Sequence, residues 1–112
     1  MSSTDEKIKQ LQLAEQGMQQ LLSQKQAFQV QLMETDSALK ELEGTQSAYR
    51  IVGNIMVSAK TEKLVEDLSS KKETLQLRIR SVEKQEASMR ERAEQVQKEV
   101  LEAMKNDDKN GK

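Results

Sequence analysis

The chain has 112 residues, of which 33% are charged and only 2% aromatic, and it contains no proline, cysteine, histidine or tryptophan. This composition excludes a thick globular core, a disulfide-linked scaffold and chemistry that depends on thiol or imidazole groups. Because 18 basic and 19 acidic residues are closely interspersed, the chain also lacks the large field of one sign that would attract nucleic acid or a membrane surface.

The N-terminal segment, residues 1–7, is polar and has no apolar region of the kind found in a signal peptide. No window of the sequence approaches the roughly 18 apolar residues that a membrane-spanning helix needs. We therefore expect a cytoplasmic location.

The first predicted element is a helix over about residues 5–43. Ser3 and Glu6 have the spacing of a capping box, and Gly44 follows the last periodic residue, where a glycine often ends a helix. Apolar residues recur every 3.5 residues on average, which is typical of a coiled-coil seam. The a and d positions of this repeat are Leu11, Ala14, Met18, Leu21, Lys25, Phe28, Leu32, Thr35, Leu39 and Leu42.

The middle of the chain, residues 48–58, predicts a β-hairpin. β-Branched and aromatic residues flank Gly53 and Asn54, a pair that can supply the positive φ angles of a two-residue turn. An isolated two-stranded hairpin is marginally stable in water, and its unpaired edges invite strand addition. We therefore expect partner strands from other subunits; the alternative is a loop that folds back onto the ends of the helices.

A second helix is predicted over about residues 61–105, with Thr61 as its N-cap. The tail, residues 106–112, has no apolar residue and is expected to be disordered. The a positions of the second helix are Val65, Lys72, Ile79, Glu86, Ala93 and Val100. The d positions, all apolar, are Leu68, Leu75, Val82, Met89, Val96 and Ala103.

Each helix alone would expose its seam, so the two are expected to cover each other as an antiparallel pair that places Leu39 opposite Leu68 and Leu11 opposite Val96. The alternative is a long parallel dimer, but a continuous helix would not need the interruption in the middle of the chain. The predicted fold is mainly α: a single domain over residues 1–112, formed by a long antiparallel two-helix coiled coil with one β-hairpin at the connecting end.

Two charged residues of opposite sign, Lys25 and Glu86, occupy seam positions at nearly the same level of this antiparallel pair. We expect them to form an intramolecular ion pair that helps to fix the register. The alternative is that both charged groups extend to water over their apolar stems.

Motifs for catalysis are missing from the sequence. The glycines are isolated, so there is no phosphate-binding loop, and the many carboxylates are spread over helical surfaces that water solvates. We therefore expect no enzyme activity, no metal site and no cofactor.

Apolar residues outside the seam gather where the first helix begins and the second ends, namely Ile8, Leu13, Leu101 and Met104. Scattered apolar residues on a surface need no explanation. A cluster of flexible Leu and Met is also the kind of surface that binds many partners by repacking. Leu22, Val30, Met33 and Leu77 extend this possibility along the helices.

Over nearly the whole chain, from Ile8 to Met104, the sequence resembles the β-type subunit of prefoldin, a hexameric co-chaperone of archaea and eukaryotes, and most closely its archaeal form. The most specific part is YRIVGNIMVSAK at residues 49–60, followed by ETLQLR at residues 73–78. A single hairpin is the mark of a β-type subunit, since α-type subunits carry two.

The resemblance implies a hetero-hexamer of two α-type and four β-type subunits, joined through their hairpins. The family holds unfolded client proteins at the ends of the coiled coils without ATP and passes them to a group II chaperonin. The implied assembly residues are Tyr49, Ile51, Val52, Gly53, Asn54, Ile55 and Val57. Client contacts, assigned by position and apolarity, are Ile8, Leu11, Leu13, Val100, Leu101 and Met104.

Two other classes of function are open to a helical hairpin. A structural coiled-coil adaptor or tether would share the fold without holding clients. A nucleic-acid-binding hairpin would need a basic stripe, which the sequence lacks.

Overall fold

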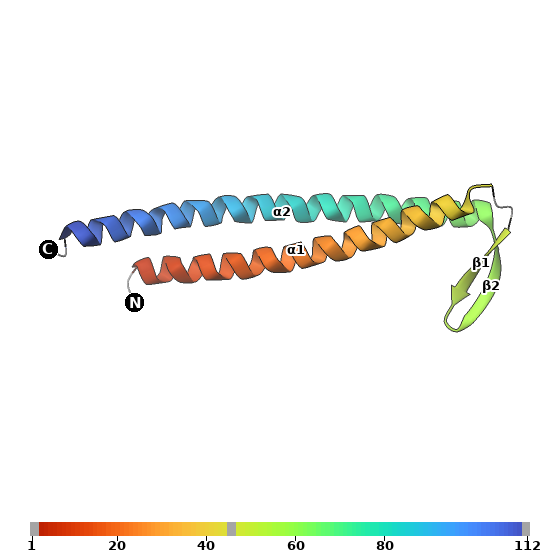
Figure 1. Cartoon of the computed structure of the whole chain (residues 1–112), viewed down its shortest axis with the longest axis horizontal. Helices are drawn as coiled ribbons and strands as arrows, with labels where there is room; N and C mark the ends of the chain where they lie inside the picture. Colours follow the sequence, from red (N-terminus) through yellow and green to blue (C-terminus); the bar gives the residue numbers. More distant parts are fainter. Residues whose placement is uncertain (1–2, 45–46, 111–112) are drawn as a thin grey trace. The chain divides into compact units, whose positions relative to one another are not determined.

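Two long helices joined by one β-hairpin make up the structure, a computed structural model that describes residues 3–44 and 47–110. Helix α1 covers Ser3–Leu42, strand β1 Ser47–Val52, strand β2 Ile55–Lys60 and helix α2 Thr61–Asn110 (Figure 1). The predicted fold class, an antiparallel two-helix coiled coil with a hairpin at its connecting end, is confirmed.

The chain separates into two compact units. Unit 1 consists of Met1–Lys25 and Ser81–Lys112, so it combines the start of α1 with the end of α2. Unit 2 consists of Gln26–Arg80 and contains the end of α1, the hairpin and the start of α2. That the whole chain behaves as one domain stays a prediction.

Helix α1 is 40 residues long and starts at Ser3, two residues before the expected boundary. Because Ser3 is its first helical residue, the N-cap position falls on residue 2, outside the described residues. At the other end Gly44 has φ of 76°, and the Glu43 amide donates a hydrogen bond of 3.2 Å to the Lys40 carbonyl. The predicted glycine stop of the helix is therefore confirmed.

The hairpin turns on Gly53 and Asn54, as predicted. Val52 pairs with Ile55 across a two-residue turn, and the antiparallel register continues to the pair Ser47 and Lys60. Gly53 has φ of 62°, and among the described residues no non-glycine has positive φ. The turn therefore has the II′ pattern, with glycine at its first central position, rather than the I′ pattern that would also need positive φ at Asn54.

Helix α2 is 50 residues long and continues to Asn110. Residues 106–110, part of the predicted tail, are thus assigned to α2, since no glycine or proline interrupts the chain before Gly111; residues 111 and 112 lie outside the described part. Thr61 is the first helical residue, and its buried hydroxyl has no hydrogen-bond partner. The prediction that Thr61 caps α2 is thus wrong, since a capping hydroxyl accepts a hydrogen bond from a backbone amide.

The core follows the predicted seam. Every buried apolar side chain of the described residues occupies an a or d position of the coiled-coil repeat. Unit 1 contains Leu21, Val82, Ala93, Val96 and Val100, and unit 2 contains Leu75 and Ile79. No large side chain among the described residues falls below 2% exposure, because two helices can cover each other on one side only.

Lys25 and Glu86, the two charged seam residues, form the predicted ion pair in unit 1. Their Nζ and Oε1 atoms lie 3.0 Å apart, and the side chains are 23% and 12% exposed. Glu86 Oε1 is buried, and the Lys25 ammonium supplies the positive charge beside it. Arg90 lies 3.8 Å from the other carboxylate oxygen of Glu86.

Further contacts between the helices agree with the antiparallel register. In unit 1, Lys7 and Glu99 lie 3.5 Å apart. In unit 2, the guanidinium of Arg78 lies 5.8 Å from the ring centre of Phe28, in cation–π geometry. The buried Thr35 donates a hydrogen bond to the carbonyl of Gln31. Its neighbour Asp36 pairs at 2.8 Å with Lys72 of α2.

Gly17 within α1 and Gly44 just after its end predict opposite responses to alanine. We expect Gly44→Ala to lower the free energy of unfolding by about 1 kcal/mol, because its φ of 76° is strained for a side chain. We expect Gly17→Ala to raise it by about 0.5 kcal/mol, since alanine favours a helix interior. The added Cβ would lie 2.9 Å from Met89 Sδ, an atom near the end of a flexible side chain that can move aside. Urea unfolding of both variants measures these changes, and equal effects would contradict the argument.

A double-mutant cycle tests the register role of Lys25 and Glu86. We expect Lys25→Leu and Glu86→Leu to show a coupling of about 1 kcal/mol or more in urea unfolding, because each leaves a partly buried charge without its partner. The pair Lys7 and Glu99, 32% and 39% exposed, is the control and should couple by less than about 0.5 kcal/mol. Strictly additive effects at Lys25 and Glu86 would contradict a role of this pair in the register.

Candidate interaction surfaces

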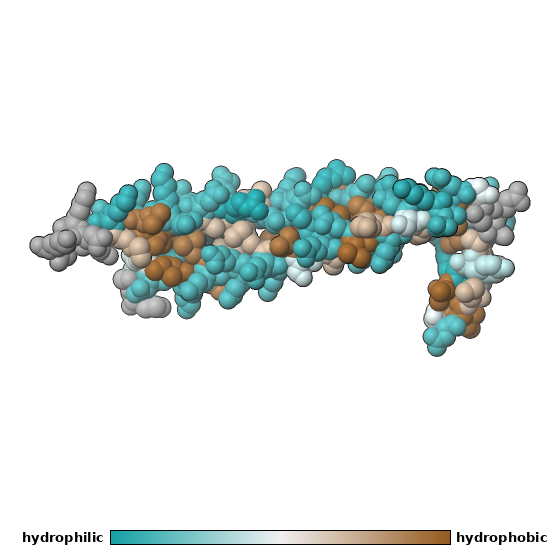
Figure 2. Space-filling model, in the orientation of Figure 1, coloured by the Kyte–Doolittle hydropathy of each residue, from teal (hydrophilic) through white to brown (hydrophobic). Residues whose placement is uncertain are grey.

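The β-hairpin leaves its apolar side chains in water. Tyr49 and Ile51 are each 70% exposed, and Val52, Ile55 and Met56 are also exposed. Figure 2 shows apolar surface on the hairpin. The alternative of a loop folded back onto the helices would bury these side chains, so it does not describe the structure.

The register divides the hairpin residues between two faces. Directly opposite residues share a face and consecutive residues alternate, so Tyr49, Ile51 and Met56 lie on one face. Arg50, Val52 and Ile55 lie on the other. Val57 lies opposite Arg50 in β2, and its side chain is outside the described part of the chain.

Both edges of the hairpin carry free backbone groups. A II′ turn closes with a hydrogen bond between the residues that flank it, Val52 and Ile55, and the pairs of an antiparallel ladder then alternate. Tyr49 and Ile51 on β1, and Met56 on β2, therefore direct their amide and carbonyl groups away from the hairpin. Among the described residues the sheet has only these two strands, so each edge can accept a further strand.

The second candidate surface is the end of unit 1 where α1 begins and α2 ends. Leu13, Leu101 and Met104 are 60%, 55% and 49% exposed. Figure 2 shows apolar surface at this end of the unit. The cluster thus presents apolar side chains to a partner.

The other three predicted client contacts at this end are less accessible. Ile8 and Leu11 are half-buried. Val100 is only 7% exposed, because its seam position turns its side chain towards α1. It cannot offer its side chain to a client while the helices are paired, which corrects its assignment as a surface contact.

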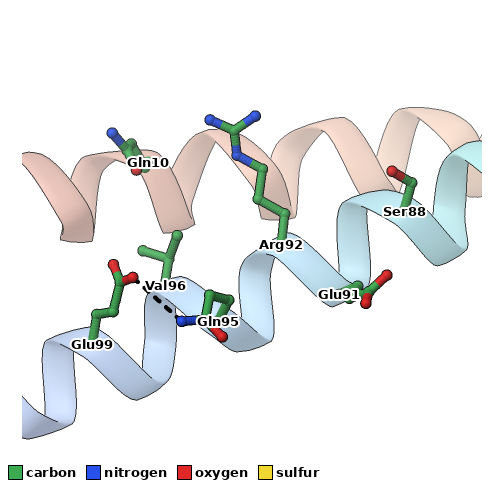
Figure 3. Close-up of a pocket in the computed structure, with 7 residues that line it drawn as sticks. All are labelled: Gln10, Ser88, Glu91, Arg92, Gln95, Val96 and Glu99. Carbon is green, nitrogen blue, oxygen red and sulfur yellow. Dashed lines mark hydrogen bonds between the residues drawn. The ribbon is translucent and has the colours of Figure 1, made fainter.

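A shallow groove follows α2 in unit 1, and six of the seven residues that line it have polar or charged side chains. Figure 3 shows Gln10 from α1 across from residues of α2, with Gln95 Nε2 donating a hydrogen bond of 3.4 Å to Glu99 Oε1. The α2 residues of the lining are Ser88, Glu91, Arg92, Gln95, Val96 and Glu99. A second depression shares Ser88 and Arg92 and continues along α2 to Lys84.

Neither the groove nor the rest of the described chain offers a metal-binding cluster of three or more acidic, histidine or cysteine side chains. The helices of the described part also include none that is both long and apolar enough to cross a bilayer. The chemistry that the described surfaces do offer is apolar contact and backbone pairing.

The structure adds a contact that the sequence did not predict. Arg50, in β1, lies 2.7 Å from Asp67 in α2, where Nη2 donates a hydrogen bond to Oδ2. The signal that could have found this contact is a lone cation within an apolar strand, with a carboxylate near the start of the following helix. Sequence alone does not give the angle between the strand and the helix, so it could not pair the two.

Known proteins resemble the chain along most of its length. A family profile described as "Prefoldin subunit" matches residues 5–107. The chain is 34% identical to a prefoldin subunit beta of Archaeoglobus fulgidus over 96 residues, which cover 83% of each protein. It is 36% identical to a prefoldin subunit beta of Sulfurisphaera tokodaii over 98 residues, which cover 84% of this chain and 78% of that protein.

A solved structure is also similar. The crystal structure of the prefoldin beta subunit from Thermococcus strain KS-1 superimposes with a TM-score of 0.85 and 29% sequence identity. The match covers 92% of this chain and 93% of the Thermococcus chain. The likeness therefore extends over both helices and the hairpin.

Proposed function

We propose that this chain, which belongs to the prefoldin family as one of its β-type subunits, is a chaperone component that holds unfolded proteins without ATP and delivers them to a group II chaperonin. The observation that carries the proposal is the apolar end of unit 1, formed by Leu13, Leu101 and Met104. Unfolded proteins expose apolar segments, which such side chains can cover. Leu and Met bind varied sequences because their flexible side chains repack against different surfaces.

Assembly through the hairpin would complete the activity. The two free strand edges and the exposed Tyr49, Ile51 and Met56 favour a hetero-hexamer of two α-type and four β-type subunits joined by strand pairing. Six chains would present their apolar ends together. Several weak contacts with one client would then add up to tight binding, because each contact after the first is intramolecular.

The same proposal places the complex in the cytoplasm and gives it no catalytic group, cofactor, nucleic-acid partner or membrane partner. Binding would depend on apolar contact alone. A client would therefore be released when a partner with a larger apolar surface competes for it, and no nucleotide would be consumed.

Removing the apolar end of unit 1 tests client capture. We expect the triple variant Leu13→Ser, Leu101→Ser and Met104→Ser, assembled with an α-type subunit, to need about tenfold more complex to suppress aggregation of a denatured protein. Light scattering during dilution of a chemically denatured protein measures the suppression. Helix content should not change, since these side chains are exposed.

A matched control carries Val30→Ser, Met33→Ser and Leu77→Ser, which remove side chains that are similarly exposed but belong to unit 2. It should suppress aggregation as well as the unchanged chain does. Equal losses in the two variants would contradict the assignment to unit 1. A wild-type complex without any suppression would instead favour the structural adaptor or tether.

Complex size tests assembly. Native mass spectrometry of the chain mixed with a candidate α-type subunit should give the mass of two α-type and four β-type chains. We expect Ile51→Asp to weaken this assembly by about tenfold or more, because a charge would have to enter an apolar interface. Leu77→Asp, at a similarly exposed site on α2, is the control and should assemble normally. A chain that stays monomeric with every α-type subunit would refute the proposed assembly.

A further inference from the structure

Among the described residues, a short polar contact joins the hairpin to α2. Arg50 Nη2 donates to Asp67 Oδ2 at 2.7 Å, the shortest ion pair found among the described residues. Both side chains are nearly half exposed, at 42% and 48%. An isolated exposed ion pair contributes little to the free energy of unfolding. The pair can still matter by fixing the orientation of the hairpin relative to α2.

Arg50 and Asp67 lie on the two elements that meet at the junction of β2 and α2, which we call the corner. Strand β2 ends at Lys60 and α2 begins at Thr61, so no linker separates the hairpin from the helix. Arg50 lies opposite Val57, about 14 Å along the strand from Thr61 at 3.4 Å per residue. Asp67 lies about 9 Å along the helix from the same corner at 1.5 Å per residue. The ion pair therefore closes a triangle whose two other sides are a strand and a helix.

No polar contact that would set its angle is described at the corner itself, where the side chains of residues 57–59 lie outside the described part of the chain. The hydroxyl of Thr61 is buried there without a hydrogen-bond partner. Within unit 2, Figure 1 shows the hairpin projecting from the start of α2 instead of lying along it. A projecting arm of two strands can swing about its junction unless a contact holds it.

The ion pair also decides which face of the hairpin is turned outward. Since Arg50 reaches α2, its face of the sheet is directed to the helix, and the face of Tyr49, Ile51 and Met56 is directed away. Val52 and Ile55 share the face of Arg50 but lie at the turn, beyond the contact. The outward face thus carries the apolar side chains of Tyr49, Ile51 and Met56 where a neighbouring hairpin would have to pack.

We propose that the Arg50–Asp67 ion pair is a brace that holds the hairpin at the angle its neighbour requires, so that both residues are positioning residues for assembly. The inference rests on the proposed function, because the neighbour is the hairpin of another prefoldin subunit. The brace orients the arm before the subunits meet. Without it, each hairpin would have to be ordered during assembly, which weakens binding.

Spin labels can measure the angle directly. The chain has no cysteine, so Asn54→Cys at the turn and Ser69→Cys on α2 can be labelled uniquely. In the unmixed chain we expect a narrow distribution of distances between the two labels. Arg50→Ala should broaden it, and the reversed pair Arg50→Asp with Asp67→Arg should narrow it again.

The affinity of assembly should change in the same way as the label distances: Arg50→Ala should weaken it and the reversed pair should restore it. We expect Arg50→Ala to raise the dissociation constant for a candidate α-type subunit by about three- to fivefold, and the reversed pair to restore most of the loss. High salt should weaken the unchanged chain towards the level of Arg50→Ala. Lys72→Ala is the matched control, since the pair Lys72 and Asp36 has a similar length of 2.8 Å and similar exposure but joins the two helices.

Two results would overturn the brace. One is a label distance distribution that is the same in Arg50→Ala and the unchanged chain. The other is equal weakening by Arg50→Ala and Lys72→Ala, which would mean that any ion pair of unit 2 matters alike. If the unchanged chain fails to assemble while its label distances respond to Arg50→Ala, the proposed function fails and the brace stands.

Discussion

Apolar side chains at the a and d positions of α1 and α2 pack against each other in a seam only two helices wide. Such a seam buries few side chains, and this limit determines which apolar side chains stay exposed for contacts with other molecules. All buried apolar side chains of the described residues lie in it, and no large one is completely enclosed. Each helix therefore keeps most of its circumference in water. A surface of this kind must be largely polar, so the apolar side chains outside the seam become candidates for contacts with other molecules.

Exposed apolar side chains outside the seam form two groups, one on the hairpin and one at the end of unit 1. The hairpin exposes apolar side chains together with unpaired strand edges, a combination suited to a partner with strands of its own. The end of unit 1 exposes Leu and Met on helices whose backbone is already paired internally, so a partner there can be bound only through side chains. Under the proposed function, specific assembly and tolerant client binding use two different kinds of surface.

A thin apolar seam does not by itself fix the register of the helices or the angle of the hairpin, and polar contacts are the groups that can fix them. Leu-rich seams can slide by a heptad at modest cost, whereas Lys25 and Glu86 meet in one register only. As Lys25 and Glu86 are expected to fix the register of the helices, Arg50 and Asp67 are proposed to fix the angle of the hairpin. The junction of the hairpin with α2 has no other described polar contact to hold that angle. We expect each pair, although of modest strength, to select one arrangement among several of similar energy.

Periodicity and turn residues were enough to predict the two helices, the turn at Gly53 and Asn54, the stop at Gly44 and the ion pair of Lys25 with Glu86, because each depends on neighbours in sequence or on a repeat. The continuation of α2 to Asn110 was missed, since composition suggests disorder although nothing in the chain stops the helix. Family membership was also readable from the sequence, and the prefoldin comparisons confirm it.

Which apolar side chains are accessible at the end of unit 1 could be learned only from the structure, because burial depends on the partner helix. Val100 carries the same apolarity as Leu101, yet its seam position buries it. The contact of Arg50 with Asp67 needed it as well, since it depends on the angle between a strand and a helix. Local patterns thus determined which elements form and in what register, while the tertiary structure decided which side chains are exposed and which face of the hairpin points outward.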